Sequence, residues 1–311
     1  MPLITTLEIG VVLAALALLT ILIFSKSPQM APSPTLRPQK LEDFVGQEGT
    51  KQVISVMTRK GRLSDHLLLV GPAGTGKTTL AYIAAGQARL HVAIGGQLRT
   101  PVAMERAIMR GRDMLFIDEI HAASRRALEI LYTALEDQTL HTSNGGTVRL
   151  QQWRLLAGTT DSGKLPAPLR DRFGQIIYLS YYSLKETSQI IKRSAKLLGV
   201  PLTSSQIGAI ARRSRGVPRV ANTLLQRVAD FSDGGKVELA PVWEALGIDT
   251  NGLTNLDRQV LEILQEADKP IGLEQLARRV GVDTSTIAND VEPYLLRRGL
   301  IDIRSGGRIA T

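Results

Sequence analysis

The stretch Gly71-Pro-Ala-Gly-Thr-Gly-Lys77-Thr78 decides the expected fold. A glycine, four further residues and then Gly-Lys-Thr form the P-loop pattern, whose backbone N–H groups surround a polyphosphate. The apolar run His66–Val70 before it predicts a buried parallel strand, and Thr78–Gln87 after it predicts a helix. A chance match in a glycine-containing loop would lack this strand and helix. The pattern therefore predicts a nucleoside-triphosphate site on an α/β domain.

Each residue type in this stretch suits a nucleotide. The glycines allow a tight loop at a helix N-terminus, where phosphate binds favourably. Lys77 can reach the β- and γ-phosphates, and the Thr78 hydroxyl can ligate Mg²⁺. The predicted phosphate-binding residues are Gly71, Gly74, Thr75, Gly76, Lys77, Thr78 and Thr79.

Length and charge limit the class of protein. A chain of 311 residues is long enough for two or three domains. The absence of cysteine excludes disulfides and thiolate metal sites. The net charge of +9 arises wholly in residues 1–199, since the remainder carries 14 Lys/Arg and 14 Asp/Glu. This excess suggests an anionic partner, either nucleic acid or a membrane surface.

The N-terminal segment predicts a membrane anchor. Residues 9–25 carry no charge and would span about 25 Å as a helix, near the lower limit for crossing a bilayer. No basic region precedes them, which disfavours a cleaved signal peptide; a buried segment is the other alternative. Because basic residues follow, the anchor would leave the rest of the chain in the cytoplasm, at the inner face of the plasma membrane. We assign 1–26 to this transmembrane helix and the proline-rich residues 27–35 to a linker.

A second apolar strand is predicted at Asp113–Asp118, followed by Glu119. Such a carboxylate pair is common alone, but about forty residues after a P-loop it indicates the Walker B arrangement. Asp118 would hold the Mg²⁺ shell, and Glu119 would deprotonate the attacking water.

Two further segments offer catalytic side chains. The strand Trp153–Thr160 ends in hydroxyls, so Thr159 or Thr160 could sense the γ-phosphate or could simply form a turn. Arg170 and Arg172 flank Asp171 and are either a local ion pair or an arginine finger that reaches a neighbouring subunit's γ-phosphate.

Beyond Ser183 the pattern becomes helical. Helices are expected at 183–198, 203–213, 217–231 and 239–246, and Arg219 near the start of the third suits an anion sensor or is a plain surface residue. From Thr254 three helices at 257–265, 273–280 and 284–298 and a glycine-tipped hairpin predict a winged helix. Its clustered arginines suit contact with the DNA backbone, although many winged helices bind only protein; they are Arg297, Arg298, Arg304 and Arg308.

With these motifs in order, residues 36–311 resemble the RuvB family of AAA+ Holliday-junction branch-migration motors. The similarity is carried by Phe44-Val-Gly-Gln47, Leu115-Phe-Ile-Asp-Glu-Ile-His121 and Ala167-Pro-Leu-Arg-Asp-Arg-Phe-Gly174, among other segments. The resemblance implies an AAA+ core at 36–182, an all-α lid at 183–250 and a winged helix at 251–311. It also implies ATP and Mg²⁺ as ligands, and hexameric rings that pull duplex DNA and are loaded by RuvA.

The resemblance assigns roles to the motifs. Thr159 or Thr160 matches sensor 1, and Arg219 matches sensor 2. Arg172 is the first choice for the finger acting in trans, and Arg170 is the second. The adenine pocket would be lined by Tyr182, Pro218, Arg37 and Pro38.

Three features depart from the family pattern. The family is soluble, yet residues 9–25 predict a membrane span. The hairpin expected within 138–152 is short and polar at Thr142–Thr147, which puts RuvA partnership in question. The wing has Gly307 where the family has an arginine, and the family's closing segment is missing after Thr311.

The leading hypothesis is an ATP-hydrolysing, ring-forming DNA motor tethered to a membrane. One alternative is a membrane-anchored DNA-binding module that switches with ATP and moves nothing. A second is a relative of clamp loaders or initiators, which the winged helix disfavours because clamp loaders end in a helical collar.

Overall fold

The structure is a computed structural model and describes residues 36–232 and 237–311. The predicted anchor and linker, residues 1–35, lie outside these described residues. Within the described ranges no helix combines the length and the apolar character needed to cross a membrane.

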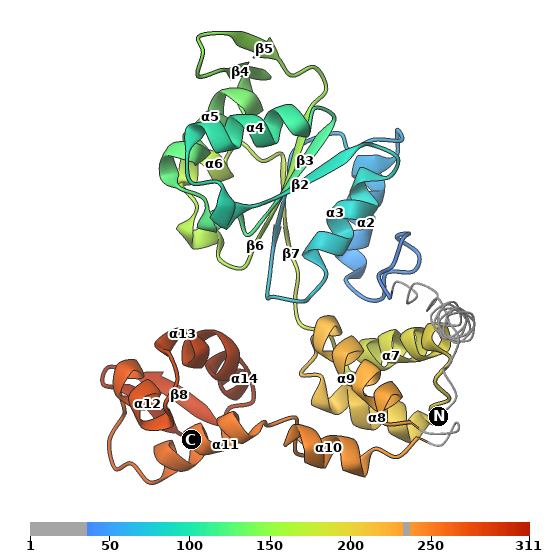
Figure 1. Cartoon of the computed structure of the whole chain (residues 1–311), viewed down its shortest axis with the longest axis vertical. Coiled ribbons are helices and arrows are strands. Elements are labelled where there is room, and N and C mark those ends of the chain that lie inside the picture. The colour runs from blue at the N-terminus through green and yellow to red at the C-terminus, as the bar shows by residue number, and fades with distance from the viewer. Residues whose placement is uncertain (1–35, 233–236) are drawn as a thin grey trace, which may run out of the picture. The chain divides into compact units, whose positions relative to one another are not determined.

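The first part of the chain forms a five-stranded parallel sheet (Figure 1). Its strand order is β2-β3-β6-β1-β7, and every neighbouring pair is parallel. The strands are β2 (Leu90–Ile94), β3 (Met114–Asp118), β6 (Arg154–Thr159), β1 (Leu67–Val70) and β7 (Gln175–Tyr178). All four residues of β1 are buried, as the uninterrupted apolar run requires of a central strand covered on both faces.

Helices cover the two faces of this sheet. Leu67 and Leu69 pack with α2 (Glu48–Thr58) and α3 (Lys77–Ala85), whereas Leu68 and Val70 pack on the opposite face. That second face is covered by α4 (Pro101–Arg110), α5 (Arg125–Glu136) and the short α6 (Ala167–Arg170). Because all strands are parallel, their carboxyl ends meet at one edge, where the nucleotide was expected.

Two elements between the P-loop and Walker B were not individually predicted. These are the strand β2 and the amphipathic helix α4. Thr100 is the N-cap of α4, and Pro101 is its first residue. An antiparallel hairpin, β4 (Thr139–His141) and β5 (Thr147–Arg149), follows α5.

The next four helices are α7 (Leu184–Leu198), α8 (Ser204–Arg213), α9 (Pro218–Asp230) and α10 (Ala240–Leu246). Capping boxes begin α7 at Ser183 and α8 at Thr203. Their apolar faces enclose one cluster that includes Ile191, Ile210 and Leu225. The predicted all-α lid is therefore present.

The last part contains α11 (Asn255–Gln265), α12 (Leu273–Val280), α13 (Thr284–Thr286) and α14 (Glu292–Arg297), then the hairpin β8 (Ile301–Arg304) and β9 (Gly307–Ala310). This is the expected winged helix. The continuous helix predicted over 284–298 is instead interrupted by a π-helical turn at Ile287–Val291. Pro293 follows at the start of α14 and has no N–H to continue the hydrogen-bond ladder.

Candidate nucleotide and DNA sites

The P-loop connects the end of β1 to the start of α3, where Gly76 is the N-cap with φ 111°. Lys77 at the first helical position is only 5% exposed. Its Nζ donates to the carbonyl oxygens of Gly71 at 2.7 Å and Pro72 at 3.1 Å. Burial lowers the pKa of Lys77, while Glu119 and Asp118 act in the opposite direction. A buried ammonium held only by loop carbonyls suits replacement of those partners by phosphate oxygens.

Thr78 and Asp118 form the pair expected to hold Mg²⁺. The Thr78 hydroxyl donates to Asp118 Oδ2 at 2.9 Å, and Oδ1 of the same carboxylate accepts from the Glu119 N–H at 3.1 Å. Among the described residues no group of three or more His, Asp or Glu side chains could hold a metal. One hydroxyl and one carboxylate fit Mg²⁺, which keeps waters and takes phosphate oxygens as its other ligands.

Glu119 follows β3 in the left-handed conformation, with φ 48°. Its Oε2 accepts from the Thr160 N–H at 3.1 Å and the Thr160 hydroxyl at 3.2 Å. His121 Nδ1 lies 3.3 Å from the same oxygen and 2.8 Å from Thr159 Oγ1. The structure thus brings Glu119, Thr159 and Thr160 together; their roles in hydrolysis stay a prediction. His121 was not predicted as a site residue; its position two residues after Glu119 was the available signal.

The region expected to hold the adenine contains two aromatic side chains. The Tyr182 hydroxyl donates to the Thr75 carbonyl at 3.0 Å, and burial raises the pKa of this tyrosine. Phe44, which sequence reasoning did not select, approaches Gly76 so closely that a Cβ there would lie 2.9 Å from Phe44 Cζ. Any side chain at position 76 would displace this ring.

Arg37 and Pro38 are not joined to the P-loop by any hydrogen bond or ion pair within the described chain. The preceding carbonyl of Leu36 instead accepts from Arg193 of α7 at 2.9 Å. The place of Arg37 and Pro38 in the adenine pocket therefore stays a prediction. Thr75 and Thr79 lie in the phosphate-binding segment, as expected.

Arg219 lies at the P-loop because α9 begins there. Its N–H donates to the Gly74 carbonyl at 3.3 Å, and a Cβ added to Gly74 would meet Val217 at 2.8 Å and Arg219 at 2.9 Å. Pro218 occupies the first turn of α9, where its missing N–H costs nothing. The exposed Arg219 side chain has no ion-pair partner in the part of the chain that the structure describes. The predicted sensor position is thus adjacent to the P-loop glycines.

Arg172 is engaged within its own subunit. Its Nη2 and Nε donate to Glu136 Oε2 at 2.5 and 3.0 Å, its Nη1 donates to the Pro168 carbonyl at 2.7 Å, and its guanidinium lies over the Tyr132 ring. Arg170 at the end of α6 is half-buried and has no side-chain partner among the described residues. To reach a neighbour, Arg172 would first have to leave Glu136.

The four arginines predicted to contact DNA do not form one free cluster. Arg308 pairs with the buried Glu292, Nε to Oε1 at 2.5 Å and Nη2 to Oε2 at 3.1 Å. The Arg297 guanidinium lies 3.6 Å from the ring centroid of Tyr181 and donates to the Arg215 carbonyl at 2.5 Å. All four arginines lie on the last helix, its C-cap and the hairpin, as predicted, but Arg297 and Arg308 also have partners within the protein. Their contact with DNA stays a prediction.

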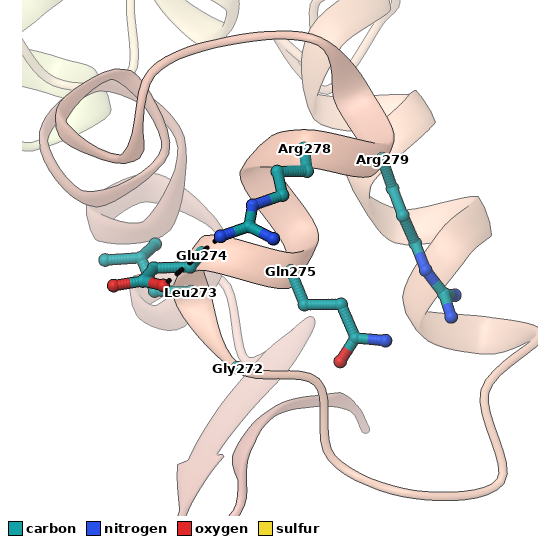
Figure 2. Close-up of a pocket in the computed structure, with 6 residues that line it drawn as sticks. All are labelled: Gly272, Leu273, Glu274, Gln275, Arg278 and Arg279. Atoms are coloured by element: carbon teal, nitrogen blue, oxygen red, sulfur yellow. Dashed lines mark ion pairs between the residues drawn. The ribbon is translucent and has the colours of Figure 1, made fainter.

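Arg298 and Arg304 remain exposed, the latter 3.3 Å from Asp302 on the same strand. Two further exposed arginines lie on α12 beside a surface hollow (Figure 2). Arg278 points toward Glu274 at 3.7 Å, while Arg279 extends away from that pair. These two were not predicted as site residues.

Four features define an AAA-type P-loop nucleoside triphosphatase. They are a P-loop at the end of a central parallel strand, a carboxylate pair at the end of β3, a helical lid that contacts the loop and a winged helix. Three family models then cover nearly all of the described chain. They are the Holliday junction DNA helicase RuvB P-loop domain over residues 36–179, the RuvB AAA lid domain over 182–246 and the RuvB C-terminal winged helix domain over 250–311.

Individual relatives agree with these models. The Holliday junction branch migration complex subunit RuvB of Kosmotoga olearia is 41% identical over 89% of this chain and 88% of its own length. Its namesake from Synechococcus sp. (strain CC9605) is 39% identical over 90% and 88%. The solved structure of the Thermotoga maritima RuvB Holliday junction branch migration motor is 38% identical, covers 89% of this chain and 95% of that chain, and has a TM-score of 0.78. The chain belongs to the RuvB family, so the resemblance seen in the sequence is confirmed.

Proposed function

We propose that this protein is an ATP-hydrolysing DNA motor that drives branch migration of Holliday junctions during recombination and repair. The observation that carries the proposal is the convergence of Lys77, Thr78, Asp118 and Glu119 at one sheet edge, in a family whose relatives bear that function in their names. The winged helix supplies a surface that can bind DNA, which a DNA motor needs in addition to its nucleotide site.

The nucleotide site has the following division of roles. Lys77 and the P-loop N–H groups bind the phosphates, and Thr78 with Asp118 holds the Mg²⁺, which neutralises charge on the phosphates when bound. Glu119 orients the attacking water and accepts its proton. Thr160, or Thr159 beside it, reports the state of the phosphate to Glu119, because Thr160 already donates to that carboxylate.

A neighbouring subunit completes the site in this proposal. Arg172 is the first choice and Arg170 the second for the residue that reaches the γ-phosphate in trans, as expected for a ring, which we propose is a hexamer. Within its own subunit Glu136 holds Arg172 at the end of the loop. Arg219 supplies the cis contact, since α9 places its backbone against Gly74.

The DNA-binding surface is assigned to the winged helix, through Arg298 and Arg304 rather than all four predicted arginines. These two side chains are exposed and make no hydrogen bond or ion pair outside the winged helix among the described residues. In contrast, Arg297, although exposed, is bound to Arg215 and Tyr181, and Arg308 is bound to Glu292. Contact from exposed arginines to phosphates would support binding without reading base sequence.

Two features of this chain differ from the family pattern. The hairpin β4–β5 has exposed residues and no apolar side chain from Ser143 to Thr147, so we do not expect a RuvA-like loader to dock there. The uncharged residues 9–25 would tether the motor to the inner face of the plasma membrane. Their length and the basic residues that follow support this location.

The deciding experiment compares Glu119→Gln with Glu129→Gln in the full chain. Glu129 is an exposed residue of α5 and serves as the matched control. Glu119→Gln should bind ATP normally and lose turnover by about 10²–10⁴-fold, with loss of ATP-driven migration of a synthetic four-way junction. Normal turnover in this variant would refute Glu119 as the base. Wild-type protein that hydrolyses ATP and binds the junction without moving it would be a membrane-anchored switch rather than a motor.

A further inference from the structure

The most informative side chain outside the predicted site is His121, which lies in the 3-10 turn Ile120–Ala122 directly after Glu119. Its Nδ1 is 2.8 Å from Thr159 Oγ1 and 3.3 Å from Glu119 Oε2. It therefore lies between the carboxylate that follows β3 and the hydroxyl that ends β6. Among the described residues no other histidine makes a hydrogen bond or ion pair with Glu119 or Thr159.

The contacts favour the tautomer with the proton on Nδ1. The ionised carboxylate 3.3 Å away cannot donate to Nδ1, and the Thr159 hydroxyl oxygen at 2.8 Å can accept from it. Thr159 Oγ1 also accepts from the Asp161 N–H at 3.1 Å. His121 thus hydrogen-bonds to Thr159 and places Nδ1 beside Glu119 Oε2, so that it connects the two strand ends.

All the hydrogen bonds and ion pairs of the Glu119 carboxylate within the described chain are made by the same oxygen. Oε2 accepts from the Thr160 N–H and the Thr160 hydroxyl and lies 3.3 Å from His121 Nδ1, whereas Oε1 has no hydrogen-bond partner among the described residues. The Glu119 side chain is about one-third exposed. Fixing one oxygen orients the carboxylate plane and leaves the lone pairs of the other oxygen for a water.

We propose that His121 is a positioning residue for ATP hydrolysis: through Nδ1 it holds Glu119 Oε2 beside the end of β6, so that Oε1 faces the attacking water. This inference rests on the proposed function and adds a residue to its hydrolytic step. Within the described residues no hydrogen bond or ion pair joins His121 to the P-loop, so in this proposal nucleotide binding does not depend on it. Loss of this hold should lower turnover at saturating ATP and leave ATP affinity unchanged.

Two substitutions at position 121 separate hydrogen bonding from side-chain volume. In His121→Asn the amide nitrogen occupies the place of Nδ1 and can still donate. In His121→Gln the amide extends to the place of Nε2 and cannot reach Glu119 in the same geometry. We expect kcat to fall about tenfold in His121→Ala and His121→Gln, and His121→Asn to recover most of it, with KM for ATP constant in all three.

A double-mutant comparison tests whether His121 acts through Glu119. Adding His121→Ala to Glu119→Gln should lower the residual turnover no further, because the group that His121 orients is already absent. A full tenfold additional loss would overturn the inference. So would unchanged or increased kcat in His121→Ala, the latter showing that His121 restrains Glu119 in an inactive position.

A structural measurement keeps this inference distinct from the proposed function. Crystal structures of nucleotide-free wild-type protein and His121→Ala need no enzymatic activity. The expected result is that Glu119 leaves Thr160 or occupies several rotamers in the variant. A Glu119 side chain that stays ordered on Thr160 without His121 would overturn the positioning role, whereas absence of ATP hydrolysis in the wild type would refute the proposed function instead.

Discussion

The nucleotide site and the winged helix differ in how well their side-chain partners could be predicted from the sequence. At the P-loop, Lys77, Thr78 and Asp118 lie together as their motifs predict. In the winged helix, four arginines were chosen by the same logic, and two of them, Arg297 and Arg308, are bound to protein groups distant in sequence. Arg297, Arg298 and Arg304 are exposed, whereas Arg308 is half-buried.

The difference lies in what positions each group. The Thr78 hydroxyl and the Asp118 carboxylate are on short side chains, and the longer Lys77 is buried and held by loop carbonyls. All three follow a backbone whose path is dictated by parallel strands and a helix N-terminus. Arginine side chains are long, and their guanidinium groups find partners that the local pattern does not reveal. Arg297, for example, donates to a carbonyl 82 residues away. Motifs held by backbone are therefore safer predictions than clusters of like charge.

The largest effect expected from a test of this comparison is a loss of local stability of the winged helix in Arg308→Ala. Its partner Glu292 is 6% exposed in its side chain, so the variant would leave an unpaired carboxylate inside the winged helix. We expect a loss of about 3–5 kcal/mol in local stability, measured by amide hydrogen exchange in α11 and β9. Arg304→Ala is the control, since its ion pair is exposed and should change stability little. Unchanged hydrogen exchange in Arg308→Ala would show that the pair with Glu292 does not stabilise the winged helix, and Arg308 would then be available to contact DNA.

An acid titration should distinguish the sheet domain from the winged helix. His66 is 4% exposed, and its Nδ1 accepts the Leu155 N–H at 3.0 Å. Burial first, and Arg154 second, lowers the pKa of His66 from 6.5 to about 4, against smaller opposite effects of Asp65 and the Leu135 backbone. Between these two values the unfolded chain binds more protons. Stability should therefore fall as pH drops from 6.5 toward 4, by up to about 3 kcal/mol from this residue.

Fluorescence can follow that transition in the sheet domain. The buried Trp153 lies 5.6 Å from His66, and Trp243 belongs to the lid cluster. Urea unfolding of Trp243→Phe protein would report on Trp153 alone. His66→Asn, whose side-chain oxygen can accept the Leu155 N–H, should weaken the pH dependence. An equally steep dependence in His66→Asn would assign it to other groups.

The smallest expected effect is on DNA affinity. Arg304→Ala should weaken duplex binding about fivefold and reduce the salt slope by about one, because one phosphate contact is lost. Arg227→Ala, an exposed lid residue paired with Asp230, is the matched control. Fluorescence anisotropy across a salt series measures both quantities. Unchanged affinity and salt slope in Arg304→Ala would contradict a phosphate contact by Arg304, and Arg278 and Arg279 on α12 would be the next arginines to test.

Much of the architecture could be predicted because its signals are local. The buried run of β1, the capping residues Ser183 and Thr203 and the glycine-tipped hairpin all have short-range causes. The helix predicted over 284–298 was wrong in its middle, where a π turn precedes Pro293. A helical period alone does not show where the hydrogen-bond ladder changes register.

The candidate site was predictable to the extent that motifs contain it. Phe44 and His121 were missed as site residues because their roles depend on strands and loops that meet only in the folded chain. Phe44 lies against Gly76, and His121 joins Glu119 to Thr159. Arg37 and Pro38 were proposed from resemblance, and no hydrogen bond or ion pair between described residues links them to the P-loop.

The sequence alone determined the family, the parallel α/β core, the lid, the winged helix and the residues that would hold phosphate and Mg²⁺. Spacing suffices for these because hydrophobic periodicity and backbone conformation act over a few residues. The tertiary structure decided which arginines have partners distant in sequence, which oxygen of Glu119 accepts from Thr160 and which imidazole lies beside it. Those outcomes depend on side chains from separate strands and helices competing for the same partners, and only the folded chain brings them within hydrogen-bonding distance.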